Sequence, residues 1–397
     1  MDFINEMEKM IPASFDAGIN WNNIEKSGFE FFIHKMKCTP QNPEFHGEGD
    51  VYTHIQMVCD ELIKMPVFWK LGKTQKVGLF TAALLHDVGK IRTTKEDDGK
   101  WVSPHHSNTG SLMVREFLWQ ICGLCGSDEK IQLRELICTL VRYHMLPVHL
   151  IDQENPERKV REVAAIGEMV PDFSWKLLCM LSVADMRGRI AADIEEQMEK
   201  IELCLAIAEE AGCEDGPYTF MTSYTKHAYL SGRNVMPDQT LYDDTWGEVI
   251  LMSGLPGTGK DTWIYSTIPE YPMISLDEIR KEMNVKPTEN QGSVIQKAQE
   301  RAKIYLRKHQ PFVWNATNIT KDIRQKQISL FERYGAGVRI VYLETEWKTQ
   351  LERNSDREAC VPAEAIKKML GKTVLPTPEE AQRIEWICVK KNNKDTN

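Results

Sequence analysis

Apolar residues recur every three or four positions through most of the first half of this 397-residue chain. This period aligns them along one face of a helix. It predicts helices over 51–62, 75–86, 107–121, 129–143, 159–169, 174–187 and 190–211. No alternation of apolar and polar residues persists there, so we expect an all-α bundle. Phe29, Phe31, Phe32 and Ile33 precede it and are expected to be core residues.

From about residue 246, short apolar runs alternate with helical patterns. The predicted strands are 249–253, 273–276, 312–315 and 338–343. The predicted helices are 260–266, 276–283, 293–308, 321–334, 347–354, 363–370 and 378–384. This alternation is typical of an α/β domain with a doubly wound parallel sheet. A connection rich in Gly, Pro, Asp and Thr precedes it, so we expect two domains, 1–235 with a core at about 50–211, and 236–397.

A glycine-rich turn follows the first predicted strand. It reads Gly254-Leu255-Pro256-Gly257-Thr258-Gly259-Lys260 and precedes a predicted helix. In this context the G-x-x-x-x-G-K spacing points backbone N–H groups at phosphates, and the lysine reaches the β- and γ-phosphates. The turn therefore predicts a site for a nucleoside triphosphate (ATP or GTP) with Mg²⁺. Asp261 follows the lysine in place of Ser or Thr, with Thr262 next, and which of the two serves Mg²⁺ stays open.

Histidines and aspartates are concentrated in the helical half. Eight of the ten histidines lie there, several at the ends of predicted helices. The candidates are His54, His86, Asp87, His106, His144 and Asp185. A metal ion needs ligands that converge from different elements, and imidazole nitrogens suit transition metals. A lone histidine is more often structural, but this order of residues on successive helices favours a metal site.

Candidate residues for phosphoryl transfer lie in the α/β half. Asp277 and Arg280 follow the second predicted strand, at the sheet edge where ligands bind. A carboxylate there can deprotonate a hydroxyl, and an arginine three residues later can grip a phosphate. Arg353 and Arg357 stand four apart on a predicted helix, as a lid over phosphates would require. Spacing alone also fits a helix-capping aspartate and solvated arginines.

The order of histidines and aspartates in the helical half resembles that of the HD-domain metal phosphohydrolases over residues 50–190. The text that carries it is Y-T-H (52–54), L-H-D-V-G-K (85–90), H-S-N-T-G (106–110), R-Y-H (142–144) and A-D (184–185). The resemblance implies that the six candidates bind two divalent transition metal ions (Mn, Co, Ni, Cu, Zn or Fe), with Asp87 bridging them. It implies that Lys90 contacts a phosphate. Arg187 and Arg189 are further candidates for holding a substrate phosphate. His106 is preferred to His105 because Gly110 then completes the family's H-x-x-x-G.

Residues 248–385 resemble the polynucleotide kinase branch of the P-loop phosphotransferases. The matching text is G-L-P-G-T-G-K-D-T-W (254–263), S-L-D-E-I-R (275–280) and R-N-S-D-R-E-A-C-V-P (353–362). It implies that Asp277 is the general base, that Arg280 holds the acceptor's phosphate, and that Arg357, with Arg353, is a lid arginine. The third strand lacks the acidic residue that many such enzymes carry, and Asn315 and Asn318 are expected to line the cleft instead.

Together the two domains resemble, in this order, the HD-Pnk type of bifunctional RNA end-healing enzyme. The resemblance implies removal of a 2′,3′-cyclic, 2′- or 3′-phosphate by the first domain and phosphorylation of a 5′-hydroxyl by the second. The implied partners are RNA ends, with DNA ends left open, and a ligase that acts downstream. Two alternatives remain: a kinase–phosphatase for a small molecule, and a nuclease-like HD module regulated by a nucleoside triphosphate.

Composition narrows the class of protein. The net charge of −9 does not indicate nucleic-acid binding, so any such site must be local. The first ten residues lack the features of a signal peptide, and no apolar run approaches the about 18 residues that span a bilayer. The ten cysteines include a single C-x-x-C, at 122–125, and all are expected to be structural thiols. We therefore expect a cytoplasmic protein without membrane contact.

Overall fold

The computed structural model describes residues 3–286, 289–357 and 359–390. Its contacts divide the chain into two compact units, Met1–Leu124 with Glu129–Tyr218, and Cys125–Asp128 with Thr219–Asn397. Residues 219–235, which the sequence pattern assigns to the first domain, contact the second unit. All ten cysteines lie in the described residues and are free thiols. Within those residues, no helix has the length and apolar character needed to cross a bilayer.

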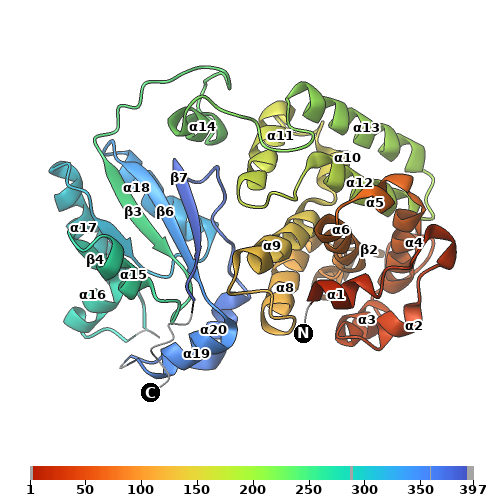
Figure 1. Ribbon diagram of the computed structural model, residues 1–397, viewed down its shortest axis with the longest axis horizontal. Coiled ribbons are helices and arrows are strands. Elements are labelled where there is room, and N and C mark those ends of the chain that lie inside the picture. Colours follow the sequence, from red (N-terminus) through yellow and green to blue (C-terminus); the bar gives the residue numbers. More distant parts are fainter. Residues whose placement is uncertain (1–2, 287–288, 358, 391–397) are drawn as a thin grey trace. The chain divides into compact units, whose positions relative to one another are not determined.

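The first unit is the predicted bundle of helices (Figure 1). Its helices are α1 (Phe3–Glu8), α2 (Trp21–Glu25), α3 (Glu30–Met36), α4 (Val51–Lys64), α5 (Pro66–Lys70), α6 (Lys73–Leu85), α7 (Lys90–Thr93), α8 (His106–Gln120), α9 (Asp128–Tyr143), α10 (Leu146–His149), α11 (Pro156–Ala164), α12 (Trp175–Arg187) and α13 (Ile194–Glu210), with 3-10 turns at Phe15–Ala17 and Ala165–Glu168. Of the four residues expected in the leader core, Phe29, Phe32 and Ile33 are buried, whereas Phe31 is exposed.

A short hairpin interrupts the helices. Strands β1 (Lys95–Asp97) and β2 (Lys100–Val102) pair antiparallel. Asp98 and Gly99 both have positive φ, as a two-residue turn between tightly twisted strands requires. The Asp-Gly pair was a local signal for this hairpin, which the search for long-range periodicity missed.

Helix α6 occupies the centre of the bundle. Every residue from Val77 to Leu85 is buried, and the helix contacts α4 and α12. Gly78 allows α9 to approach closely, because a Cβ atom there would lie 2.7 Å from Leu136 Cδ2. Since α6 is surrounded on all sides, its C-terminus delivers the next two residues, His86 and Asp87, into the interior.

The second unit is built on a five-stranded parallel sheet with the order β4-β5-β3-β6-β7 (Figure 1). The strands are β3 (Glu248–Ser253), β4 (Met273–Ser275), β5 (Val313–Asn315), β6 (Gly337–Glu344) and β7 (Arg383–Cys388). The helices are α14 (Ser223–Leu230), α15 (Lys260–Thr267), α16 (Leu276–Met283), α17 (Gly292–Arg307), α18 (Lys321–Glu332), α19 (Trp347–Ser355) and α20 (Ala363–Leu370). The α/β prediction and its four strands are confirmed.

The predicted helix over 378–384 is wrong. Residues 378–379 form a turn, and β7 begins at Arg383 as an edge strand that pairs with β6. The alternation of β7 is weak because its residues are mostly half-buried. Pairing with β6 therefore decides this segment, and a local pattern cannot reveal it.

Helices cover both faces of the sheet. On one face, α17 buries a row at every fourth position: Val294, Ala298, Ala302 and Leu306. On the other face, α15 packs Ile264 and Ile268 against the sheet. The inner strands β3, β5 and β6 are buried on both sides, as expected for a parallel sheet, and the carboxyl ends of the strands meet at one edge. That edge positions the loops after β3, β4 and β5.

A buried ion pair anchors the segment that leads into β7. Arg324 donates to both carboxylate oxygens of Glu380 at 2.7 Å, and neither side chain is exposed to solvent. We predict that Arg324→Ala lowers the free energy of unfolding of the second unit by about 3–5 kcal/mol, because Glu380 would remain buried and unpaired. Amide hydrogen exchange in peptides from β3 and β6 measures this change.

Lys321→Ala is the matched control, because Lys321 lies on the same helix and pairs with Glu379 while nearly half exposed. Its effect should stay below about 1 kcal/mol. Equal effects of the two substitutions would contradict the assignment of the buried pair as the anchor.

Candidate functional site

Four histidines of the helical unit meet through their Nε2 atoms. His54 Nε2 lies 3.3 Å from His86 Nε2, and His106 Nε2 lies 3.3 Å from His144 Nε2. The rings of His86 and His144 are also in contact, with centroids 5.1 Å apart. The residues come from α4, the end of α6, α8 and the end of α9. The structure thus brings together all four histidines that the sequence singled out as metal ligands.

The opposite nitrogen of each ring faces a backbone carbonyl. The Nδ1 partners are Gly188 for His54, Ala83 for His86, Ser103 for His106 and Val141 for His144, at 2.8–3.0 Å. A carbonyl can only accept, so Nδ1 of each ring carries a proton, and in a neutral ring Nε2 keeps its lone pair. The four Nε2 atoms therefore point into one space, where the lone pairs of neutral rings repel each other unless a cation lies between them.

The Asp87 carboxylate spans the two histidine pairs. Its Oδ2 lies 3.5 Å from His86 Nε2 and 3.7 Å from His54 Nε2. Its Oδ1 lies 3.3 Å from His106 Nε2 and 3.9 Å from His144 Nε2. Oδ1 is buried and accepts no hydrogen bond from the described residues. Each oxygen of this carboxylate thus faces one pair of imidazoles.

Asp185, on α12, completes the cluster on one side. Its Oδ1 lies 3.0 Å from His54 Nε2 and 3.9 Å from His86 Nε2. Arg189, one turn later, donates to both of its carboxylate oxygens. Within the described residues, several groups of three among these side chains have ligand atoms close enough to share an ion.

The protonation of the cluster suits a metal ion. Burial lowers the pKa of His144 to about 3 and also lowers the pKa of His106, so both rings are neutral. Burial raises the pKa of Asp87 and Asp185, but the charges of Lys90 and Arg189 outweigh this and hold both pKa values well below the usual range. Neutral imidazoles and ionised carboxylates are the forms that bind divalent transition metals. At His54, burial lowers the pKa but the carboxylates of Asp185 and Glu48 outweigh this and raise it, so an ion at Nε2 would displace a proton there. With that exchange the residues present fit such ions.

A close approach of two backbone segments, made possible by glycines, holds the two halves of the cluster together. A Cβ atom on Gly89 would lie 2.0 Å from the carbonyl oxygen of His106 and 2.6 Å from the amide nitrogen of Gly110. Only glycine permits the segment after α6 to touch the first turn of α8 in this way. The glycines of H-D-x-G and H-x-x-x-G therefore explain why Asp87 reaches His106.

Lys90 is buried and belongs to the cluster. Its ammonium lies 2.7 Å from Asp87 Oδ2, donates to Gln41 Oε1 at 2.6 Å and lies 3.4 Å from His46 Nε2. It is therefore not a surface lysine. Of the other candidates, His105 and Arg187 are exposed and lie outside the cluster.

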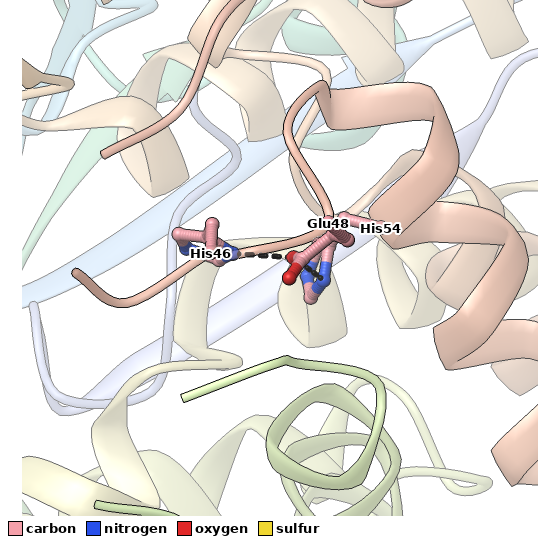
Figure 2. A group of neighbouring side chains, drawn as sticks. All are labelled: His46, Glu48 and His54. Carbon is pink, nitrogen blue, oxygen red and sulfur yellow. Dashed lines mark hydrogen bonds and ion pairs between the residues drawn. The ribbon is translucent and has the colours of Figure 1, made fainter. Parts of the chain in front are cut away.

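Sequence reasoning missed three residues of this site: Gln41, His46 and Glu48. They lie in the loop before α4, which the sequence describes only as rich in turn residues. Figure 2 shows the side chains of His46 and His54 converging on Glu48. Burial lowers the pKa of His46 to about 4, so its ring is neutral. A second histidine and a glutamate within eight positions of His54 were the available signal.

The glycine-rich turn of the second unit has the geometry of a phosphate loop. Gly254, Gly257 and Gly259 all have positive φ. Gly254 and Gly257 also lack room for a side chain, because a Cβ atom would lie 2.6 Å from the Leu343 carbonyl oxygen and 2.5 Å from that of Gln350. The loop runs from the carboxyl end of β3 into α15, whose N-terminus favours anions.

Lys260 begins α15 and folds back over the loop. Its ammonium donates to the carbonyl oxygens of Gly254 and Leu255 at 2.8 and 2.9 Å. Burial is the main influence on this lysine and lowers its pKa to about 8. The ammonium is thus held at the loop by carbonyl groups that a phosphate can replace.

The predicted acceptor residues lie together at the end of β4. Asp277 pairs through Oδ1 with Arg280, and its Oδ2 lies 3.4 Å from Arg357 Nη2. Arg353 lies near the phosphate loop, since its Nη1 would be 3.7 Å from a Cβ atom on Gly259. Asp277 is half exposed, so a substrate can reach it.

Two expectations about this cleft are wrong. Arg353 and Arg357 do not share a helix face, because α19 ends at Ser355 and the chain then turns back to bond Asn354 to Val361. Asn318 does not line a cleft but is buried, and its amide bonds to the Met252 carbonyl oxygen of β3. The bond of Asn318 is tertiary and the turn at Asn354 follows no helical spacing, so residue spacing predicted neither.

Asn315 is the strand-end residue that meets the loop. At the end of β5, its Nδ2 donates to Asp261 Oδ1 at 2.6 Å. Thr262 is exposed on the first turn of α15. The carboxylate that follows Lys260 is thus tied to the strand position where many P-loop enzymes carry an acidic residue.

Comparison with known families agrees with this division. Residues 59–166 match the family model of the HD domain, and residues 249–376 match the family model of an AAA domain. The HD match contains His86, Asp87, His106 and His144, whereas His54 and Asp185 lie outside its limits. One chain therefore combines an HD phosphohydrolase-type domain with a P-loop kinase-like domain.

The lowered pKa of Lys260 generates a prediction for nucleotide binding. Bound phosphates favour the charged ammonium and raise its pKa above 8. Below about pH 7 the lysine is charged in both states, whereas near pH 9 binding should take up roughly one proton. The affinity for ATP should therefore fall as pH rises above 8. Calorimetry in buffers of different ionisation heat measures the uptake.

Lys260→Arg is the control, because arginine stays charged throughout this range. The variant should bind ATP without proton uptake above pH 8. An uptake in this variant equal to that of the wild type would assign the proton to another group.

Proposed function

We propose that this protein repairs broken RNA ends with two active sites. The HD unit would remove a 2′,3′-cyclic, 2′- or 3′-phosphate, and the P-loop unit would phosphorylate a 5′-hydroxyl with a nucleoside triphosphate. The observation that carries the proposal is the presence in one chain of a buried histidine–aspartate cluster suited to metal ions and a phosphate loop with Asp277, Arg280 and Arg357 at its edge. The substrate class rests on the sequence resemblance.

For the hydrolytic reaction, the metal ligands would be His54, His86, Asp87, His106, His144 and Asp185. Divalent ions at such a site supply polarisation of a phosphoryl group and activation of a water molecule. Asp87 would bridge two ions, because each of its oxygens faces a different histidine pair. Lys90 would hold a non-bridging phosphate oxygen, exchanging one of its present acceptors for the substrate.

For the kinase reaction, the backbone of Gly254–Lys260 would hold the triphosphate and Lys260 would neutralise its charge. Asp277 would take the proton of the attacking hydroxyl, and Arg280 would bind the acceptor's phosphate. Arg357, assisted by Arg353, would stabilise charge on the transferred group. Both Arg280 and Arg357 pair with Asp277 in this structure, so a bound substrate would free the carboxylate by giving the arginines phosphates to bind.

We assign the Mg²⁺ of the kinase site to Asp261 in preference to Thr262. Many P-loop enzymes hold this ion with a hydroxyl after the lysine and an acidic residue at a strand end. Here the carboxylate follows the lysine and the amide of Asn315 stands at the strand end, bonded to it at 2.6 Å. The two groups would thus have exchanged places, which leaves one carboxylate at the ion.

A substrate with both damaged ends tests the proposal. We predict that the wild type converts both ends of an RNA oligonucleotide bearing a 5′-hydroxyl and a 2′,3′-cyclic phosphate, given ATP, Mg²⁺ and Mn²⁺. Asp87→Ala should lose only the phosphate removal and Asp277→Ala only the phosphorylation, each by at least about 100-fold. Each end is scored separately by electrophoresis and mass spectrometry.

Other outcomes identify the alternatives. Phosphorylation of a mononucleoside but of no oligonucleotide would indicate a small-molecule kinase–phosphatase. Phosphate removal that needs Lys260 but not Asp277 would indicate regulation by nucleotide. Activity at the 3′ end that persists in Asp87→Ala and after removal of metals by a chelator would exclude the metal site.

The exchanged magnesium ligands give a separate prediction. Asp261→Ser should raise the Mg²⁺ concentration for half-maximal kinase rate by at least about tenfold, because the carboxylate is lost. The double variant Asp261→Ser with Asn315→Asp should recover much of this loss, since it returns a carboxylate to the strand end. Steady-state kinetics at varied Mg²⁺ measures both.

Thr262→Ala is the control and should leave the Mg²⁺ dependence unchanged. A large effect of Thr262→Ala together with a small effect of Asp261→Ser would show that the threonine hydroxyl serves the ion instead.

A further inference from the structure

Glu48 is a buried carboxylate that the hydrolytic mechanism above does not use. Its side chain is 1% exposed. Figure 2 shows His46 and His54 on either side of it, and its Oε1 lies 2.8 Å from His46 Nδ1 and 3.0 Å from His54 Nδ1. Its Oε2 accepts the backbone N–H of Ile190 at 3.0 Å. One carboxylate therefore accepts N–H groups from His46 and Ile190 and lies beside the Nδ1 of His54, whose proton also faces the Gly188 carbonyl oxygen.

The loop that carries Glu48 is fixed to the segment after α12. The backbone N–H of Gly47 donates to the Ile190 carbonyl oxygen at 2.9 Å, next to the bond from Ile190 to Glu48. A Cβ atom on Gly47 would lie 3.0 Å from that same oxygen, so glycine allows the close approach. These bonds hold the carboxylate in one place between the two histidines.

The position of the His54 proton distinguishes two possible roles of Glu48: ligand of a separate ion, or acceptor that orients the histidine. His46, Glu48 and His54 have ligand atoms close enough to share an ion of their own. A neutral imidazole has one lone pair, however, and His54 Nδ1 lies 3.0 Å from both the Gly188 carbonyl and Glu48. Because both neighbours only accept, Nδ1 carries a proton and cannot bind an ion. Nε2 is then the only ring nitrogen of His54 that an ion can use, and it lies 3.0 Å from Asp185 Oδ1.

We propose that Glu48 is a positioning residue of the hydrolytic site, holding His54 with its Nε2 toward the metal ions and His46 with its Nε2 toward Lys90. A carboxylate behind a metal-binding histidine fixes the ring and makes it a stronger ligand. This inference rests on the proposed metal site. It gives Glu48 and His46 the role of orienting other residues, with no direct part in the chemistry.

His46 extends the arrangement from Glu48 to Lys90. Because His46 donates from Nδ1 to Glu48, its Nε2 is an acceptor, 3.4 Å from the Lys90 ammonium. The three protons of Lys90 then have three acceptors: Asp87, Gln41 and His46. Glu48 thus sets the orientation of one metal ligand and of one neighbour of the phosphate-binding lysine.

Titration of the full-length protein with Co²⁺ tests the proposal without any substrate. Co²⁺ bound to imidazole and carboxylate ligands has a visible absorption spectrum that reports their geometry. We expect Glu48→Ala to bind the same number of ions as the wild type, with about 10- to 100-fold weaker affinity and an altered spectrum. Glu48→Gln keeps one acceptor oxygen, so its affinity for Co²⁺ should lie between those of the wild type and Glu48→Ala.

Glu44→Ala is the matched control, because Glu44 lies in the same loop but is exposed and pairs with Lys100. It should bind Co²⁺ as the wild type does. Amide hydrogen exchange in peptides from α6 and α12 checks that the helical unit of each variant is folded. Wild-type affinity and spectrum in Glu48→Ala would overturn the proposal, and loss of one whole equivalent with no change at the others would assign an ion to His46, Glu48 and His54. Failure of the wild type to bind Co²⁺ would instead reject the metal site itself.

Discussion

Hydrogen bonds from histidine Nδ1 to backbone carbonyls determine what the helical unit can do. In three of the four cases the carbonyl belongs to the residue three positions earlier, so the local turn of the chain sets the ring without outside help. His54 is the exception and depends on Gly188, at the end of a distant helix. Because Nδ1 faces a carbonyl in every ring, every Nε2 faces inward, and the buried carboxylates Asp87 and Asp185 add negative charge to the same space. A buried, ionised cluster of this kind is unfavourable on its own and is stabilised by cations.

The P-loop unit solves a similar problem of charge in a different way. Its triphosphate site uses backbone N–H groups and a helix N-terminus, which are fixed by the fold and do not titrate. Only Lys260 adds a mobile charge, and it rests on carbonyl oxygens of the loop. The residues proposed to bind the acceptor are more exposed and pair with one another, with Asp277 between two arginines. Binding of substrate can therefore rearrange ion pairs here at little cost, because exposed pairs are weak.

Much of this could be predicted from the sequence. The helical and α/β halves, the strands β3 to β6 and the phosphate loop all follow from local periodicity and turn chemistry. The histidine–aspartate order indicated six residues that the fold does bring together. Two predictions failed because a partner distant in sequence decides the outcome: β7 forms only against β6, and Asn318 is held by β3. A third failed because a local turn ends α19 before Arg357, where Asn354 bonds to Val361.

The sequence by itself determined which side chains are candidates to bind metal and phosphate, because residue type and local spacing set ligand chemistry. Only the tertiary structure decided their protonation and their neighbours. It buried Lys90, exposed His105, joined Asn315 to Asp261, and placed Glu48 behind His54. The physical reason is that burial and hydrogen-bond partners from distant segments control which atom of a ring or carboxylate carries a proton. That information exists only once the loops before α4 and after α12 pack against each other.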